Sequence, residues 1–265
     1  MSDGEEAGDR RVLRITGKDR ESFLQGLVSN DVRRLAQGPV YAALLTPQGK
    51  YLADFLLVPA PDSILLDVKD RLAEALMRRL LMYRLRADVA IAPAGLHVVR
   101  GLGPKPADAR DDPRHPALGW RAWREAEGGP PTIDWDAIRV AHVIAETGVE
   151  LVPDETYILE AGFERLHGVD FRKGCYVGQE VTARMKHKTE LRKGLRQVGV
   201  RGEAAPGTPI TIDGREVGTL FTRSGDRAIA YLRLDRIGAG MVAGAADVVA
   251  EQANDAVDGA DPAPT

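Results

Sequence analysis

The sequence predicts an α+β protein in which ferredoxin-like split βαβ units are followed by a small antiparallel β-barrel. Residues 10–100 give the order strand, helix, strands, helix, strand, which is the split βαβ plan. Beyond Leu191 the pattern changes to short strands separated by turn residues such as Asp213-Gly214. The 265 residues, 44% of them hydrophobic, are enough for two or three small domains.

The N-terminal unit, residues 10–100, follows from hydrophobic periodicity. Leu13 and Ile15 alternate with Arg14 in a first strand, and a helix begins near Asp19. A second short helix is expected at 29–35. We expect the remaining elements to be strands at 40–45, 51–58, 64–68 and 88–91 and a helix with Leu72, Leu76 and Leu80 on one face.

The rest of the chain divides by composition. Residues 101–117 are rich in Pro, Gly, Asp and Ala and predict a loop, and 118–190 predict a middle α+β unit with a strand at 120–123 and a helix at 134–146. The barrel is expected at 191–238. Residues 239–265 lack aromatic residues and carry acids without Lys or Arg, which predicts a disordered acidic tail.

Composition limits the class of protein. A single cysteine excludes an internal disulfide, which predicts a cytoplasmic location, and it cannot supply the four thiolates that hold most iron–sulfur clusters. The five histidines show no metal-ligand spacing, so no bound metal is expected. The sequence contains no run of 18 apolar residues, so no membrane-spanning helix is expected. Residues 172–201 hold nine Lys or Arg against two acids, which suits either a solvated surface or an anion-binding wall for carboxylates, phosphates or RNA.

The segment 173–180, Lys-Gly-Cys-Tyr-Val-Gly-Gln-Glu, is the main chemical feature. It places Cys175 between two glycines and beside Lys173. Residues 169–171 predict a strand, and Val177, Val181 and Met185 are spaced as in a helix, so the thiol is expected at a strand-to-helix turn. A helix N-terminus and a nearby cation lower a thiol pKa. The alternative is that the cysteine is an inert, buried apolar residue.

Residues 166–180, together with 23–32 and 45–55, resemble the YgfZ family. The resemblance covers most of 12–236 and implies a T-protein-like fold, the fold of the glycine cleavage T-protein, in a tetrahydrofolate-binding protein. It also implies support of iron–sulfur enzymes and of tRNA modification. The candidate cofactor-binding residues that it implies are Asn30, Asp31, Glu160, Arg172, Lys173, Gly174, Tyr176, Gly178, Gln179 and Glu180.

Three functions are weighed on this basis. The first is a tetrahydrofolate-binding protein that assists assembly or repair of iron–sulfur enzymes, with Cys175 and Lys173 as the working groups and with client or assembly proteins, and RNA only indirectly, as partners. The second is an aminomethyltransferase-like enzyme using Asp54, although Ala53 stands where the T-protein has a second acid. The third is a non-catalytic RNA or protein adaptor. The sequence favours the first.

Overall fold

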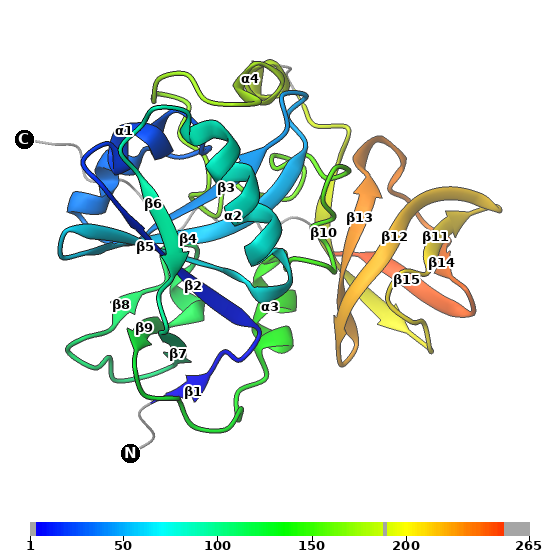
Figure 1. Cartoon of the computed structure of the whole chain (residues 1–265). Coiled ribbons are helices and arrows are strands. Elements are labelled where there is room, and N and C mark those ends of the chain that lie inside the picture. Colours follow the sequence, from blue (N-terminus) through cyan, green and yellow to red (C-terminus); the bar gives the residue numbers. More distant parts are fainter. Residues whose placement is uncertain (1–3, 188–189, 252–265) are drawn as a thin grey trace, which may run out of the picture.

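The N-terminal part of the chain forms a five-stranded antiparallel sheet in the order β3-β4-β5-β2-β6 (Figure 1). The computed structural model describes residues 4–187 and 190–251. The strand, helix, strands, helix, strand order is confirmed. Its elements are β2 Arg10–Thr16, α1 Arg20–Gln25, the 3-10 helix η1 Val32–Ala36, β3 Val40–Leu45, β4 Tyr51–Ala60, β5 Ser63–Lys69, α2 Asp70–Arg84 and β6 Ala90–Pro93.

Both faces of this sheet are buried, which explains why its central strands are almost continuously apolar. Along β3, Ala42 and Leu44 face the core formed with α1, η1 and α2, whereas Tyr41, Ala43 and Leu45 face the core formed with the middle of the chain. The alternation follows from the period of two along a strand. The sheet therefore lies between its own helices and the second unit.

The second sheet contains strands from separate parts of the sequence, in the order β1-β7-β9-β8. β1 Glu5–Glu6 pairs with β7 His97–Gly101, so β7 belongs to the second sheet although residues 10–100 were predicted as one unit. The predicted loop 101–117 contains β8 Arg110–Asp111 and the start of the 3-10 helix η2 Pro116–Leu118. β9 Trp120–Arg124 and α3 Trp135–His142 complete the unit.

Two predicted helices differ from the structure. The helix expected at 134–146 ends at His142, because Val143 adopts a left-handed φ of 50° and Arg165 donates to the carbonyl oxygens of both residues. The helix expected at 29–35 is η1, which begins after Asp31, whose carboxylate accepts from the Arg33 backbone N–H as an N-cap.

The C-terminal unit is a closed antiparallel barrel in the strand order β10-β13-β12-β11-β14-β15 (Figure 1). Its interior is filled by small and branched apolar side chains, such as Val198, Ile210, Leu220 and Leu232. The elements are β10 Lys193–Arg201, β11 Pro209–Ile212, β12 Arg215–Ser224, β13 Arg227–Arg233, the 3-10 helix η3 Leu234–Arg236, β14 Met241–Ala243 and β15 Ala246–Ala250.

The predicted disordered tail is wrong for the segment that contains β14 and β15. β15 pairs with β10 and β14 pairs with β11, so these two strands close the barrel. Met241, Ala243, Ala246 and Val248 are buried inside it. Small residues suffice here because the interior of a six-stranded barrel is narrow. Residues 252–265 of the predicted tail lie outside the described residues.

The segment between α3 and the barrel contains one further helix, α4 Gln179–His187. Residues 144–178 form turns and loops that pack on the first sheet, and they carry most of the candidate site residues. In the described part of the chain, no helix is both long enough and apolar enough to cross a membrane.

Candidate functional site

Cys175 is a free, exposed cysteine in the loop that precedes α4. The loop lies at the same end of the molecule as α1 and α4 (Figure 1). Arg172, Gly174 and Glu180 beside it are also exposed, and Glu180 forms an ion pair with Arg184 at 2.6 Å. Exposure excludes the alternative that this cysteine is an inert residue of the core.

Lys173 holds the loop that carries Cys175 against the end of α1. Its side chain is buried, and Nζ donates to the backbone carbonyl oxygens of Gln25 at 2.8 Å and Val28 at 2.5 Å, at the end of α1. Burial lowers the pKa of Lys173 to about 8, against the opposing charges of Asp31 and Asp170. Lys173 therefore uses its ammonium group to anchor the loop to α1.

Tight packing of two glycines fixes the other end of the loop. Gly178 has a φ of 84°, and a Cβ there would lie 2.6 Å from the carbonyl oxygen of Thr46. Gly49, in the turn between β3 and β4, has a φ of 75°, and a Cβ there would lie 2.8 Å from the Cβ of Val181 in α4. Tyr176 is buried between these anchors. The thiol thus projects from a loop that is held on both sides.

The predicted setting of the thiol, a strand-to-helix turn, is wrong. Residues 169–171 form no strand, and α4 begins at Gln179, because Gly178 has a positive φ that a right-handed helix cannot accommodate. The field of a helix N-terminus falls off within the first turn. Cys175 lies four positions before α4, and the Lys173 ammonium group donates to the carbonyl oxygens of Gln25 and Val28.

Asn30 and Asp31 both form hydrogen bonds with other residues of the chain. The Asn30 amide donates to the carbonyl oxygens of Tyr41 at 2.8 Å and His167 at 2.7 Å. Asp31 accepts from the Arg33 side chain, which is the main cause that lowers the Asp31 pKa to about 2. The two residues join η1, β3 and the loop at 167 to one another.

Asp54 is buried and accepts hydrogen bonds from three hydroxyl groups. Tyr41 Oη donates at 3.0 Å and Tyr51 Oη at 2.8 Å, and Thr147 Oγ1 is the third donor. Burial, followed by the Asp54 charge, raises the pKa of both tyrosines well above their usual range. The carboxylate joins the first sheet to the middle unit, and this arrangement gives no support to Asp54 as a group that contacts substrate.

Glu160 lies in a different place from the other candidates. Its Oε2 accepts from Tyr231 Oη of β13 at 2.6 Å, and its backbone carbonyl accepts from Leu195 N at 2.9 Å, so it borders the barrel. Its second carboxylate oxygen accepts no hydrogen bond from the residues that the structure describes. In the described structure, Glu160 forms no hydrogen bond with the other candidates Asn30, Asp31 and Lys173.

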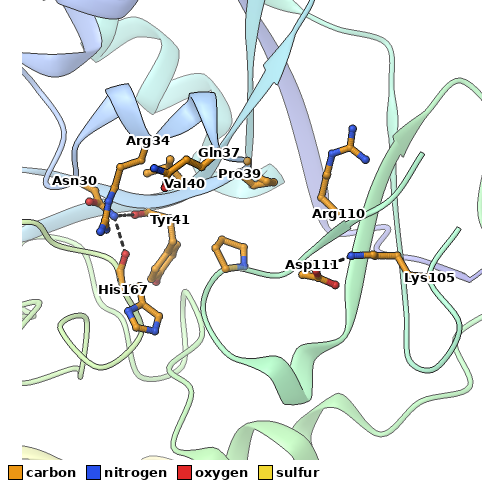
Figure 2. A pocket seen from close by; sticks show the side chains of 12 residues that line it. Asn30, Arg34, Gln37, Pro39, Val40, Tyr41, Lys105, Arg110, Asp111 and His167 are labelled. Carbon is orange, nitrogen blue, oxygen red and sulfur yellow. Dashed lines mark hydrogen bonds and ion pairs between the residues drawn. The ribbon is translucent and has the colours of Figure 1, made fainter. Parts of the chain in front are cut away.

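Two cavities are present at the surface of the described chain. One, of about 460 Å³, is lined by Asn30, Arg34, Tyr41 and His167 on one side and by Lys105, Arg110 and Asp111 on the other (Figure 2). The other, of about 870 Å³, lies where the three units meet and is lined by charged residues that include Lys69, Arg100, Arg139 and Glu146. Neither contains Cys175 or Glu160.

The sequence reasoning missed a buried ionic network between the two sheets. Asp67 of β5 accepts from Arg10, Arg121 and Trp123, and Arg121 also donates to Asp112 at 2.7 Å. The available signal was a single acid within the apolar strand at 64–68, because a lone carboxylate in such a strand needs a buried cation.

The basic segment 172–201 does not form one wall. Arg184 pairs with Glu180, Lys186 pairs with Glu164, and Lys173 points inward. Lys188 lies outside the described residues. Of the remaining cations, Arg172 lies in the loop before α4, and Arg192, Lys193, Arg196 and Arg201 lie in or just before β10, so the described part of the chain does not support a continuous surface for RNA.

Comparison with known proteins adds to this geometry. Residues 192–256 match the family model of the C-terminal beta-barrel domain of CAF17. The solved structure of the glycine cleavage system aminomethyltransferase T from Bartonella henselae superposes with a TM-score of 0.73 at 13% identity, covering 92% of this chain and 83% of that chain. At this identity the similarity shows the fold alone, and it confirms the predicted T-protein-like architecture with a C-terminal barrel.

Curated relatives extend the comparison to sequence. The chain is 34% identical over 216 residues to the mitochondrial iron–sulfur cluster assembly factor IBA57 homolog of Mycosarcoma maydis, covering 69% of this chain and 54% of the relative. It is 29% identical over 277 residues to iron–sulfur cluster assembly factor IBA57 of Mus musculus, covering 86% and 76%. The chain thus spans little more than half the length of the first relative.

These relatives correct one prediction and support another. They are mitochondrial proteins by name, which contradicts the cytoplasmic location predicted from the single cysteine. A reducing compartment is all that cysteine usage indicates, and it does not identify the organelle. The names mention iron–sulfur assembly but neither folate nor RNA. The chain is therefore similar over most of its length to iron–sulfur cluster assembly factors, on a fold that it shares with aminomethyltransferase T.

Proposed function

We propose that this protein assists the assembly or repair of iron–sulfur enzymes and that Cys175 is the thiol that takes part. The observation that carries the proposal is the exposed thiol on a loop fixed by Lys173 on one side and by Gly178 on the other. The similarity to iron–sulfur cluster assembly factors supports the same role. Iron–sulfur enzymes that modify tRNA are among the clients we propose.

One thiol suits a cluster that is shared between two proteins. Clusters are usually held by four cysteine thiolates, and this chain contains one cysteine. A partner must therefore supply the other ligands, and the thiol must reach it without unfolding of the loop. An exposed cysteine on an anchored loop meets both requirements. The cluster is then cargo that passes between proteins.

Replacement of Cys175 by serine tests the proposal. In cells that lack their own assembly factor of this kind and carry this chain, Cys175→Ser is expected to lose most support of an iron–sulfur dehydratase, because serine removes the thiolate ligand with little change in volume. Gly174→Ala is the matched control, since a Cβ at Gly174 meets no atom within 4 Å. Iodoacetamide should also alkylate Cys175 in the folded protein.

Two results would contradict the assignment of Cys175. One is full iron–sulfur enzyme activity with Cys175→Ser. The other is a thiol that iodoacetamide reaches only in denaturant, because the exposed position requires reaction in the native state. Equal losses in Cys175→Ser and Gly174→Ala would assign the effect to the shape of the loop, and would likewise remove the thiol from the proposal.

Tetrahydrofolate binding is a finer part of the proposal, and Glu160 is the residue that supports it. One of its carboxylate oxygens has no partner in the described structure, and a carboxylate can accept from both the ring N–H and the amino group of a pterin. The T-protein-like fold agrees with such a ligand. Asn30, Asp31 and Lys173 already form hydrogen bonds with other residues of the chain, so Glu160 is the candidate with a carboxylate oxygen left for a ligand.

The Glu160→Ala variant is expected to bind tetrahydrofolate about ten- to a hundred-fold more weakly, because a charged hydrogen-bond partner contributes about 1.5–3 kcal/mol. Isothermal calorimetry of the whole chain measures this directly. Glu164→Ala is the control, since Glu164 pairs with Lys186 and has no pterin role here. Equal affinity of Glu160→Ala and the unmodified protein would remove Glu160 from the pterin contact.

A further inference from the structure

The C-terminal half of α2 presents apolar side chains to solvent. Leu81 is 37% exposed, Met82 73% and Leu85 87%. We call these residues, with Arg78, Arg79 and Arg86, the α2 patch. Single exposed apolar residues are common on protein surfaces, but three neighbours on one helix are a feature of binding surfaces.

The spacing shows that the patch is separate from the core. Leu81 and Met82 lie three and four positions after Arg78, which places the three residues on one face of α2, and Leu85 follows directly after the last helical residue, Arg84. Ala73, Leu76 and Leu80 occupy the opposite face and are buried against the first sheet. The helix thus has a second apolar stripe that packing within this chain does not explain.

Leu85 has a backbone conformation that is unusual for its residue type. It follows α2 with φ 47° and ψ −107°, the mirror image of an ordinary extended turn conformation. This region normally takes glycine, as at the first central position of a type II′ turn. A leucine here is strained, and at 87% exposure it gains almost no packing in return. Strain without packing in the chain itself indicates that the side chain is used in binding.

The charged residues within 78–86 are all positive. Residues 78–86 contain four arginines and no acid. Within the described part of the chain, Arg79 and Arg86 form no ion pair, and Arg78 has only the exposed Glu74 at 3.8 Å. Methionine and arginine are enriched in protein interfaces, whereas lysine, which is absent from 78–86, is depleted. The complement of this surface is a segment with both acidic and apolar side chains.

The patch lies near the loop that carries the thiol. Asp88, just after the patch, accepts from and donates to Asp19 at the start of α1, and Lys173 binds the Gln25 carbonyl at the end of α1. α1 has six residues, so its two ends are about 9 Å apart. The end of α2, α1 and the loop before α4 lie in the upper part of Figure 1. α1 thus links the patch to the loop, and a partner with a standard interface of about 800 Å² on each side would extend from the patch toward that loop.

We propose that the α2 patch docks an acidic, apolar segment of the protein that shares the iron–sulfur cluster, and so holds that protein over Cys175. The inference rests on the proposed function and adds the chemistry of the partner surface to it. Met82 and Leu85 supply the buried contact, and the arginines select acidic partners and exclude basic ones.

The first test is a photo-crosslinking amino acid at position 82 of the full chain, in the cells used for Cys175→Ser. The expected result is attachment to an iron–sulfur protein within a segment rich in Asp, Glu and apolar residues, and a loss of at least about tenfold in yield with the Arg79→Glu/Arg86→Glu variant. The same photo-crosslinker at Val249, an exposed apolar residue of β15, is the control position. Attachment to a basic segment, to a second copy of this chain or to lipid, or no attachment, overturns the proposal.

The second test separates docking from folding. Met82→Ser/Leu85→Gly removes the apolar contact, and glycine relieves the strain at position 85, so the melting temperature should be unchanged or higher while iron–sulfur enzyme activity falls. Val249→Ser should change neither. Full activity in Met82→Ser/Leu85→Gly overturns the docking proposal even if Cys175→Ser is inactive. If no iron–sulfur enzyme loses activity when the chain is absent, the proposed function is wrong. The docking proposal is then judged only by whether the segment crosslinked to position 82 is acidic and apolar.

Discussion

Replacing Asp67 by alanine is expected to lower the free energy of unfolding by about 3–5 kcal/mol, the usual result of removing one partner from a buried ion pair. The Asp67 side chain is completely buried and accepts from Arg10 Nε at 2.6 Å and Trp123 Nε1 at 3.1 Å, with Arg121 Nη1 at 3.5 Å. Without the carboxylate, Arg10 loses the only ion-pair partner that it has among the described residues, and it stays buried. Urea unfolding measures the change.

Tryptophan fluorescence is a suitable probe for this unfolding experiment, because Trp123 donates to Asp67 and all three tryptophans lie in the second unit. Asp111→Ala is the matched control. Its side chain is 78% exposed and pairs with Lys105 at 2.6 Å, so its loss should cost less than about 1 kcal/mol. If Asp67→Ala were as mild as Asp111→Ala, the two sheets would not depend on the buried network.

The parts of the fold that depend on local pattern were predictable. The strands expected at 40–45, 51–58 and 64–68 correspond to β3, β4 and β5, because a Pro- and Gly-containing turn joins the first two and apolar runs define all three. The barrel strands around Asp213-Gly214 were predictable for the same reason. In each case the signal lies within a few residues of the element that it specifies.

The parts that depend on distant partners were not predictable. β14 and β15 are only three and five residues long, and they are ordered by pairing with β10 and β11 across the barrel. β1 is two residues long and exists because it pairs with β7, more than 90 positions later. For β14 and β15, amino-acid composition favoured disorder, because composition contains no information about the strands with which a segment pairs.

The candidate site shows the same division. Cys175 was identified by its motif, and its exposure agrees with a working group. The direction of the Lys173 side chain was not predictable, because its acceptors at Gln25 and Val28 are almost 150 residues away. Glu160 was placed with Asn30 on resemblance, whereas its contact is with Tyr231 of the barrel. A motif specifies residue types, and tertiary contacts decide which of their atoms stay free.

Glu150→Ala is expected to lower the free energy of unfolding by about 3 kcal/mol, because Glu150 joins the middle unit to the barrel. Its buried carboxylate accepts from Arg139 Nη2 at 2.7 Å, from the Glu146 backbone N–H at 2.9 Å and from both the N–H and the hydroxyl of Thr222 in β12. The expected loss of stability is at the low end of the range for a buried ion pair, because Arg139 still pairs with Asp136 at 2.9 Å and with Glu146 at 3.7 Å.

Asp136→Ala is the control that isolates burial, because Asp136 pairs with the same arginine but is 62% exposed, and its loss should cost less than about 1 kcal/mol. Both variants are to be measured above pH 4.5. Although burial alone would raise the pKa of Glu146, Lys69 and Arg139 lower it to about 2. Because the folded pKa lies below the unfolded value of 4.5, the stability that Glu146 contributes is complete above pH 4.5 and is lost as the pH falls toward 2. A Glu150→Ala effect no larger than that of Asp136→Ala would mean that packing of α3 on β12, and not this ion pair, holds the barrel in place.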